Sequence, residues 1–386
     1  MSAGPRLDER TGRFAVIGIT IIALAARLVM LGWRVAHQDE ARVTNWILHY
    51  VRTDSWSYKP IIHGPFLPHV NGVIFTWFGP SDFTARAIVA IIGGLLPLVV
   101  FLLRDRLTPG ERVGVAAFLA ANPILLYYSR FMRNDVPLAA FALLAVAAFV
   151  AWRDRGSIRF LYLGIAAYAL GLTMKENALV YLIAWGGALV LLLDHRLTLA
   201  EDWYEKLGSI ARKMFLEGRR IRWHLVPLAL VFWTIVIAFY APKPELYRAI
   251  VNPTRLPGVI ETATMGSWDK FMDVWGASSM RDHSYLSFLG SYLKDLGAAA
   301  VPLSGAAIIG FIVDRYRGER PRDLTSFCFY WGVASVVGYP LIMDIRAAWS
   351  TAHALVPLAI PAGIGLAYAG RKIAKAINAD GPAPSL

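Results

Sequence analysis

The feature that most constrains the fold is a series of apolar runs that recur along the whole chain. Each run is about 17 to 22 residues long, and a helix needs roughly 20 apolar residues to cross the hydrocarbon core of a bilayer. The pattern therefore predicts an all-α polytopic membrane protein, because helices satisfy their own backbone hydrogen bonds in lipid. The length rule gives about ten spans, centred on 13–35, 83–103, 112–129, 135–152, 158–174, 177–193, 223–240, 296–313, 324–343 and 352–370.

Composition supports the same class of protein. Of the 386 residues, 56% are hydrophobic and 17% are charged, whereas soluble domains carry roughly 25% charged residues. The net charge is +12, which in a membrane protein is first explained by Lys and Arg in the cytoplasmic loops. We therefore predict the lipid bilayer as a partner and no nucleic-acid partner. The single cysteine, Cys328, excludes a disulfide framework within the chain.

Basic segments between the predicted spans give the orientation. They are 104–112, 152–159, 195–222, 314–323 and 371–375. All lie on one side if each predicted span crosses once, and the positive-inside rule makes that side cytoplasmic. We expect one membrane domain over 1–386 in the plasma membrane, with both termini and the tail 371–386 in the cytoplasm. The large loops 36–82 and 241–295 are then external.

The apolar stretch from Pro65 to Gly79 is predicted to lie on the outer surface. It has only about 15 residues, short of the roughly 20 that a span needs. If it crossed the bilayer, every later basic loop would be placed outside. We therefore expect an interfacial helix here, preceded by a second helix over 39–53 in the same external loop. A short, tilted span is the alternative.

Ionisable residues stand at every predicted external junction. They are Asp39, Glu40, Arg86, Arg130, Arg133, Asp135, Lys175, Glu176, Asp344, Arg346 and His353. Any one of them has a simpler explanation, such as a solvated helix end, a snorkelling arginine or an ordinary ion pair. Ionisable groups in a bilayer are costly, however, and they usually mark a site or a water-filled cavity. Their joint position predicts a catalytic cavity that opens outward.

Motifs for common cofactors are missing from the sequence. There is no GxGxxG or GK[ST] loop for a soluble nucleotide and no Cys/His ligand set for zinc. Asp39 and Asp135 could together hold a divalent cation, Mg²⁺ or Mn²⁺, through carboxylate oxygens. We favour a site without a metal, and no other cofactor is predicted.

Several motifs together resemble a known family. A "DE" follows the first span, then a Pro- and aromatic-rich stretch containing "HGPF", then "SDFTAR", "NPILLYYSRFMRNDVPLAAF" and "GLTMKENAL". These resemble the membrane glycosyltransferases of the GT-C superfamily, on the branch of the protein O-mannosyltransferases and the lipid A aminoarabinose transferase. The closest resemblance is to prokaryotic flippase-activity-associated membrane proteins. It covers roughly 13–195 and returns at "RAAWSTAHALVPLAIPAGIG" (346–365).

The resemblance implies a GT-C fold with juxtamembrane helices in the first external loop, and it implies roles for single residues. The family's general base, an aspartate of that loop, matches Asp39, and the residue beside it matches Glu40. The arginine that opens the second span matches Arg86. The second acidic motif of the family matches Asp135, with Arg133 before it.

Two further matches lie later in the chain. The family's Lys-Glu pair matches Lys175 and Glu176. Near the end, relatives often have a Lys, then a Pro-Trp pair and then a His. Here the cation is Arg346, Ala348 replaces the proline, and the histidine is His353.

The function implied is transfer of a sugar from a polyprenyl-phosphate donor to a protein or glycan acceptor at the outer face, with inversion. We expect Asp39 to act as general base and Glu40 to orient the acceptor or a nearby cation. Cations must stabilise the departing phosphate, and Arg133, Lys175 and Arg346 are the candidates.

The remaining candidates have supporting roles. They are Arg86, Asp135, Glu176 and His353 around the reacting groups, and His63, Trp268 and Trp275 for the acceptor or the sugar. For each single aromatic residue, an interfacial aromatic belt is the competing explanation.

Two other function classes stay open. A transporter or flippase component for lipid-linked sugars could bind the same phosphate without breaking a bond. It should show charges near the middle of spans and interrupted helices in paired halves, whereas here the charges cluster at the outer ends. A member of the fold that assembles with other proteins and has no activity is the third class.

Overall fold

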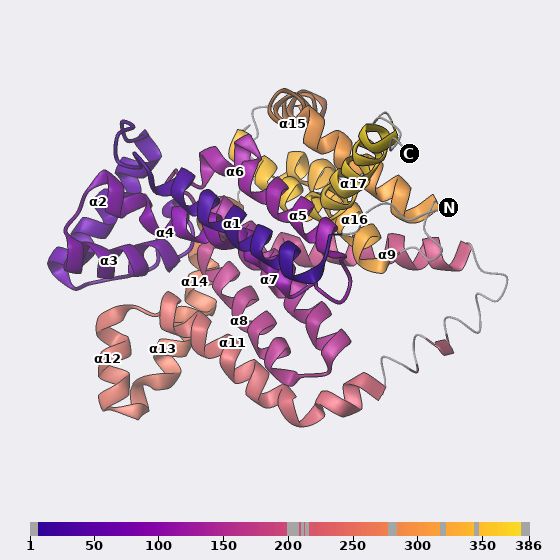
Figure 1. Cartoon of the computed structure of the whole chain (residues 1–386). Helices are drawn as coiled ribbons and strands as arrows, with labels where there is room; N and C mark the ends of the chain where they lie inside the picture. The colour runs from indigo at the N-terminus through magenta and orange to yellow at the C-terminus, as the bar shows by residue number, and fades with distance from the viewer. Residues whose placement is uncertain are drawn as a thin grey trace.

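The computed structural model describes residues 7–198, 208–209, 212, 216–276, 284–316, 322–342 and 347–379. Within these ranges the regular structure is helical throughout, and no strand occurs. Figure 1 shows a bundle of long helices, with shorter helices gathered at its left. The protein is thus an all-α polytopic membrane protein, as predicted from the sequence.

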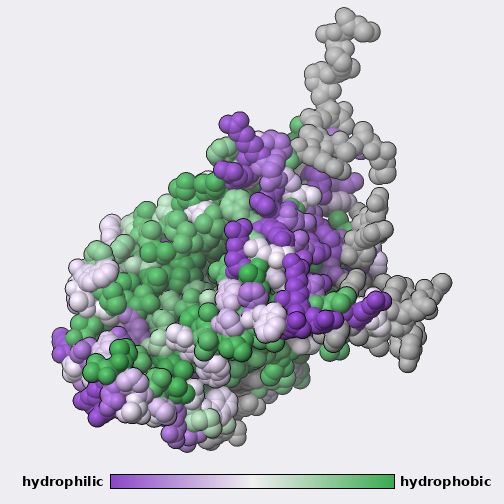
Figure 2. All heavy atoms as spheres, turned by 90° about the horizontal axis from the view of Figure 1, so that it is seen from below, coloured by the Kyte–Doolittle hydropathy of each residue, from purple (hydrophilic) through white to green (hydrophobic). Residues whose placement is uncertain are grey.

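Each predicted span lies on a helix. In chain order the helices are α1 (Glu9–Leu28), α4 (Asp82–Leu95) continued by η2 (Leu96–Phe101), α5 (Pro109–Ala121) with α6 (Pro123–Tyr128), α7 (Asp135–Arg155), α8 (Ile158–Met174), α9 (Ala178–Thr198), α11 (Leu225–Tyr240), α15 (Tyr285–Tyr316), α16 (Asp323–Ile342) and α17 (Ala352–Ala379). Among the described residues, 6 helices are long and apolar enough to cross a membrane, by length and composition. Figure 2 shows a broad hydrophobic surface with hydrophilic residues gathered at its two ends.

The centre of the bundle is α17, which packs against α5, α7, α15 and α16. Glycines allow the closest approaches. A Cβ on Gly310 of α15 would lie 1.8 Å from the carbonyl oxygen of Pro361, and a Cβ on Gly363 would lie 2.4 Å from the amide nitrogen of Val115. Small residues at such contacts let membrane helices pack backbone to backbone. This packing fixes the start of α17, where His353 lies.

One end of the bundle, which we call the site end, is where α1 and α8 finish and where α4, α7 and α17 begin. Hydrogen bonds join these helix ends. Arg86 of α4 donates to the carbonyl of Leu31, 3.0 Å away, just after α1, and Lys175, just after α8, donates to Asp135 at the first position of α7. The charged junction residues of the sequence are therefore neighbours in space.

The first loop contains two helices at the site end, α2 (Gln38–Thr53) and α3 (Phe66–Phe78). The chain enters α3 where the amide of Gly64 donates to the carbonyl of Met174, 3.1 Å away at the end of α8. It leaves α3 through a two-residue link into Ser81, the cap of α4. Because both ends of α3 lie at the site end, α3 does not cross the bundle.

The second loop also lies at the site end. It contains α12 (Lys243–Val251), η4 (Pro253–Arg255), α13 (Leu256–Ala263), α14 (Met265–Phe271) and η5 (Met272–Gly276). The Trp275 indole donates to the carbonyl of Pro60, 3.1 Å away in the first loop. The sequence placed the end of this loop at residue 295, whereas α15 already begins at Tyr285. Lys294 and Asp295 interrupt the apolar run without interrupting the helix.

The placement of α3 predicts that both of its flanks face the same side of the membrane. Single cysteines replacing Asp54 and Ser81, both exposed, should react with a membrane-impermeant thiol reagent from one side only. A cysteine at the exposed Arg104, at the opposite end of α4 and η2, should react from the other side. Cys328 is fully buried and gives no background. Labelling of positions 54 and 81 from opposite sides would contradict the fold.

Candidate functional site

A network of charged side chains crosses the site end. The Asp39 carboxylate accepts a hydrogen bond of 2.5 Å from the Arg133 guanidinium. The Nε atom of Arg133 lies 3.9 Å from Oδ2 of Asp135. The Oδ1 atom of Asp135 accepts from Lys175 Nζ at 3.0 Å and lies 3.2 Å from Nε2 of His353. Side chains far apart in the sequence thus meet at one place.

Asp39 is the accessible carboxylate of this network. His37 caps α2, which places Asp39 in the first helical turn, where the helix dipole favours a negative charge. Its side chain is 33% exposed, whereas the side chain of Asp135 is 2% exposed. A ligand can therefore reach Asp39 while it keeps its bond to Arg133.

Glu40, the next residue, is buried, and hydrogen-bond donors surround both of its carboxylate oxygens. Arg86 donates to both of its oxygens, at 2.8 and 2.9 Å, and Arg34 donates at 2.9 Å. The backbone amides of His37 and Met132 also donate to this carboxylate, at 3.0 and 2.9 Å. Burial alone would raise the pKa of Glu40, but these hydrogen bonds outweigh burial and lower it.

The two acidic neighbours therefore differ in what they can do. A carboxylate offers about four lone-pair sites, and donors from three parts of the chain occupy those of Glu40. Glu40 ties α2 to α4 and to the segment before α7, which makes it suited to holding the site together. Arg86 pairs with Glu40 and thereby supports the residue next to Asp39.

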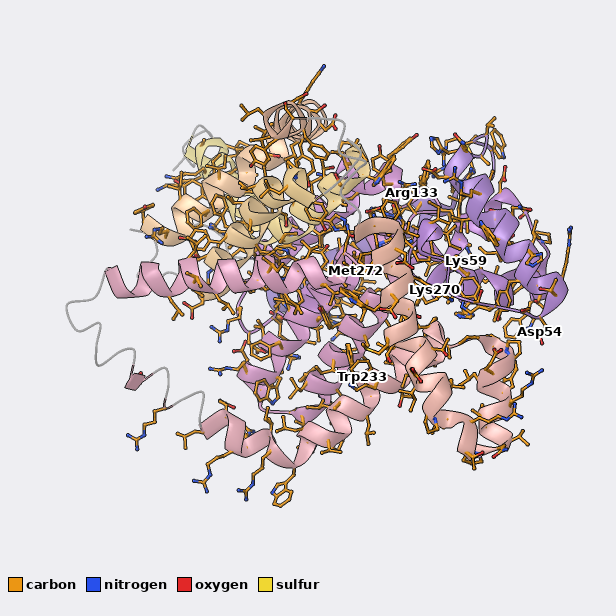
Figure 3. All side chains as sticks on the ribbon, turned by 180° about the vertical axis from the view of Figure 1, so that it is seen from behind. Asp54, Lys59, Arg133, Trp233, Lys270 and Met272 are labelled. Atoms are coloured by element: carbon orange, nitrogen blue, oxygen red, sulfur yellow. The ribbon has the colours of Figure 1, made fainter. Side chains whose placement is uncertain are left out.

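Arg133 stands between two carboxylates and on an aromatic ring. Its guanidinium carbon lies 3.6 Å from the centre of the Trp349 ring, a cation–π contact. The side chain is 15% exposed. Figure 3 labels Arg133 where the first loop meets the bundle. The stacking and the bond to Asp39 hold the planar donor group in one orientation, ready for an anion.

Among the described residues, nothing donates a hydrogen bond to one oxygen of Asp135. Its Oδ2 atom is buried and unbonded, although Oδ1 receives Lys175. Two tyrosines hold the ring of His353 in place. The Tyr181 hydroxyl lies 2.5 Å from its Nδ1 atom, and the Tyr339 ring stacks on it with ring centres 4.5 Å apart. A free acceptor next to Arg133 is unusual for a buried carboxylate and indicates a place where a ligand can add a donor.

Glu176 faces a different environment from Lys175. The Tyr58 hydroxyl donates to its Oε1 atom, and Nδ1 of His63 lies 3.8 Å from its Oε2 atom. Burial raises the pKa of Glu176 to about 7, and the bond from Tyr58 and the charge of Lys175 oppose this rise. Burial also lowers the pKa of His63 well below its usual value, so that the ring is neutral.

The three candidates for the acceptor or the sugar lie close to Glu176. His63 stacks on Trp275 with ring centres 5.7 Å apart. It also adopts a φ of 64°, a strained value for a residue that is not glycine. Trp268 lines a hollow of about 250 Å³ together with Glu176 and Tyr58. His63, Trp268 and Trp275 are thus grouped around Glu176.

Sequence reasoning missed the tyrosines of the site. Tyr58 bonds to Glu176. Tyr181 bonds to His353, and Tyr339 stacks on it. Only the aromatic-rich stretch around Tyr58 gave a signal in the sequence. Arg346, a predicted phosphate ligand, and Asp344 lie outside the described residues.

The described residues do not fit a divalent metal at Asp39 and Asp135. Arg133 lies between the two carboxylates and bonds to Asp39, and Lys175 occupies an oxygen of Asp135. Mg²⁺ takes six oxygen ligands, several of them usually water, and no group of three or more His, Cys, Asp or Glu side chains suited to a metal occurs in the described part of the chain. The side chains of Arg133 and Lys175 thus occupy the carboxylate oxygens that a metal ion would need.

An apolar furrow runs along the bundle to this site. A hollow of about 650 Å³ is lined by Tyr168 of α8, Leu182 and Trp185 of α9, and Phe232 of α11. The smaller hollow at Glu176 is lined by residues of the same three helices, Leu172 of α8, Leu179 of α9 and Trp233 of α11, which Figure 3 labels. Tyr168 and Leu172 are one turn apart on α8, as are Leu182 and Leu179 on α9, so the two hollows lie next to each other along the bundle, and we call them together the furrow.

The side chain of Tyr181 separates the larger hollow from His353, a member of the charged network. Trp185 lines the larger hollow and stacks on Tyr181 with ring centres 5.9 Å apart. The hydroxyl of Tyr181 in turn contacts His353, which contacts Asp135.

One family model matches part of the chain. Residues 62–215 match the family described as dolichyl-phosphate-mannose-protein mannosyltransferase. No curated protein matches the chain in sequence. The narrower resemblance to flippase-activity-associated proteins stays a prediction.

Solved structures give the fold. ArnT from Cupriavidus metallidurans bound to undecaprenyl phosphate superimposes with a TM-score of 0.63 at 19% identity, over 94% of this chain and 63% of that one. The archaeal oligosaccharyltransferase AglB from Archaeoglobus fulgidus, in complex with an inhibitory peptide and a dolichol-phosphate, gives 0.59 at 16% identity, over 97% and 52%. The chain spans less than two thirds of the length of each. It has the fold of the GT-C membrane glycosyltransferases, and residues 62–215 carry the sequence pattern of their mannosyltransferase family.

Proposed function

We propose that the protein transfers a sugar from a polyprenyl-phosphate donor to an acceptor at the site end. The observation that carries this proposal is the pairing of the exposed Asp39 with Arg133, beside the buried pair of Asp135 and Lys175. A base and two cations thus stand together at the end of an apolar furrow. ArnT and AglB, which share the fold, were solved with a polyprenyl or dolichol phosphate.

The reaction is a single displacement at the anomeric carbon. A hydroxyl or amide of the acceptor attacks that carbon, and Asp39 accepts the proton that the acceptor loses. The bond between the anomeric carbon and the phosphate oxygen breaks, and its electron pair leaves with the lipid phosphate. Attack from the side opposite the phosphate inverts the configuration of the carbon. Asp39 then returns the proton to solvent through its exposed face.

Arg133 and Lys175 bind the phosphate, and we propose Arg346 as a third cation. An arginine fork binds two phosphate oxygens, and its attraction increases as negative charge develops on the leaving group. Asp135 keeps Lys175 and His353 in place, and its free oxygen can accept a hydroxyl of the sugar. His63, Trp268 and Trp275 contact the sugar or the acceptor from the other side.

The site faces outward in the plasma membrane in this proposal. The basic segments 104–112 and 152–159 lie at the bundle end opposite Asp39, and the positive-inside rule assigns that end to the cytoplasm. Both termini are then cytoplasmic. The acceptor is a protein or a glycan, which the donor meets at the outer surface.

Binding of undecaprenyl phosphate to Arg133 variants tests the proposal. We expect Arg133→Ala to weaken binding about 10- to 150-fold, since a hydrogen bond to a charged group contributes roughly 1.5–3 kcal/mol. Arg133→Lys should restore part of the affinity, because it keeps the charge and loses the fork. Lys270→Ala, an exposed lysine on α14, is the matched control.

Three results would contradict the proposal. Unchanged affinity in Arg133→Ala would remove Arg133 from the phosphate site. Wild-type protein that binds the lipid and moves lipid-linked sugar across vesicle membranes, without forming a glycosylated product, would be a transporter. A protein that binds the donor and does neither would be a non-catalytic member of the fold.

A further inference from the structure

The smaller hollow surrounds one carboxylate with aromatic rings. Glu176 is 8% exposed and lines the hollow, whose volume is about 250 Å³. Aromatic side chains from the first loop, α11 and α14 form much of the wall; they are Tyr58, Trp233, Tyr240, Trp268 and Phe271. Among the described residues that line the hollow, none is a Lys or an Arg. The hollow thus offers a ligand one acidic group and several aromatic rings.

Glu176 has no ion pair with a Lys or an Arg in the described part of the chain. Its Oε1 atom accepts from the Tyr58 hydroxyl. His63 faces its Oε2 atom at 3.8 Å, too far for a hydrogen bond, and burial lowers the pKa of His63 so that the ring is neutral. Lys175 bonds to Asp135 instead, because extended backbone at Lys175 sends neighbouring side chains to opposite sides. Buried charges in proteins are paired, so an ionised Glu176 fits a ligand that brings a cation.

The hydroxyl groups of the wall also favour a ligand that donates hydrogen bonds. Those of Tyr240 and Ser267 donate to backbone carbonyls, and that of Tyr58 donates to Glu176. Each hydroxyl proton is therefore used within the chain, and the oxygens keep lone pairs. Lone pairs accept from an N–H group and repel an anion.

The aromatic wall suits an organic cation better than a metal ion. Ring faces attract cations, Trp most strongly and then Tyr and Phe. The rings of Tyr58 and Tyr240 contact each other with centres 4.9 Å apart, and those of Trp268 and Phe271 lie 5.6 Å apart. Mg²⁺ takes six oxygen ligands, whereas an organic ammonium group needs one counter-ion and fills apolar space with its carbon atoms.

We propose that the hollow at Glu176 binds an organic ammonium group, with ionised Glu176 as the counter-ion and the aromatic side chains around the cation. This gives Glu176 a direct contact with a ligand, where the sequence suggested a supporting role. The sugar of the donor and a side chain of the acceptor are the two sources of such a group at this end of the bundle. The inference goes beyond the proposed function, because the cation binds here without the lipid phosphate.

Choline and its uncharged carbon analogue, dimethylbutanol, test the proposal, because the two molecules have nearly the same shape and only choline is charged. Each is titrated calorimetrically into the purified full-length protein in a maltoside detergent, at pH 8, above the pKa of about 7 that burial gives Glu176. Choline should bind about tenfold more tightly or better, since the counter-ion and the ring faces act on the charge alone. Equal affinity for the two probes, or no binding of choline, would overturn the inference.

Glu176→Gln keeps the size of the side chain and an acceptor for Tyr58, and it removes the charge. It should weaken choline binding about tenfold or more, because opposite charges attract strongly in surroundings of low dielectric constant. Binding of dimethylbutanol should not change, which shows that the hollow is intact. Glu261→Gln, an exposed acid on α13, is the matched control and should bind both probes as wild type does. Wild-type affinity of Glu176→Gln for choline would overturn the inference.

Trp268→Leu tests the aromatic wall. Leucine keeps an apolar surface and lacks the ring, so choline binding should weaken about 2- to 30-fold and dimethylbutanol binding should weaken less. Trp77→Leu, an exposed tryptophan on α3, should change neither. An equal loss for both probes would overturn the contribution of the ring face.

Two further pairs of probes distinguish the sources of the ammonium group. Glucosamine is compared with glucose, and a lysine blocked at both ends is compared with blocked norleucine. The pair whose charged member binds more tightly to wild type, and loses this advantage in Glu176→Gln, identifies the source. No advantage in either pair would overturn both sources. Binding of undecaprenyl phosphate is measured separately, so the proposed function and this inference can fail independently.

Discussion

Asp39→Asn is expected to abolish sugar transfer, with a fall in kcat of about 10²–10⁴-fold, the usual contribution of a general base. Asparagine has the shape of aspartate but cannot take the acceptor's proton. The protein should still fold, because Asp39 is partly exposed and Arg133 keeps its stacking on Trp349. The measurement is turnover of a lipid-linked sugar donor by the purified variant.

Donor binding separates this effect from a structural one. Asp39→Asn should bind undecaprenyl phosphate about as well as wild type, because the proposed phosphate ligands are intact. Asp82→Asn, an exposed aspartate in the first turn of α4, is the matched control and should keep full turnover. Turnover of Asp39→Asn within about tenfold of wild type would dismiss Asp39 as the base.

Arg86→Ala is expected to destabilise the protein by about 3–5 kcal/mol, the cost of leaving one partner of a buried ion pair uncompensated. Arg86 and Glu40 have side chains that are 1% and 3% exposed. Arg86 also donates to the carbonyls of Leu31 and Arg34 after α1. Its loss should therefore loosen the first loop and lower the free energy of unfolding. Denaturant unfolding of the purified protein in detergent measures the change.

The control is another ion pair of the same kind in a different place. Arg106 pairs with Asp154, and its side chain is 40% exposed. Arg106→Ala should cost less than Arg86→Ala, because a pair whose arginine is 40% exposed contributes less than a pair buried on both sides. Arg86→Ala with Glu40→Gln should be more stable than Arg86→Ala alone, since the buried charge is removed. Equal stability of Arg86→Ala and Arg106→Ala would contradict a structural role for the Glu40 pair.

The membrane architecture could be predicted because it follows from local quantities. The length of an apolar run decides whether a helix can span, and the positions of Lys and Arg predict which ends share a side. These two rules place Arg86 and Asp135 at starts of spans and Lys175 at the end of one, where the structure has them. The rule that a span needs roughly 20 residues also predicted that α3 does not cross.

The contacts within the site could not be predicted in the same way. Arg133 meets Asp39 across 94 positions, and His353 meets Asp135 across 218. The second pair depends on how α17 packs into the bundle, where glycine contacts such as that of Gly310 with Pro361 allow a close approach. Nothing in the local sequence reports the position of a distant helix.

The sequence by itself determined that this chain forms membrane helices and that the ionisable residues of its predicted external junctions share one end, because apolar length and loop charge act locally. The tertiary structure alone decided what each charge does. Asp39 and Glu40 are adjacent in sequence and both acidic, yet one is exposed beside Arg133 and the other is buried among its donors. Lys175 and Glu176 differ likewise. The reason is physical: the partners and the access to water that set a carboxylate's chemistry come from distant helices, which only packing brings together.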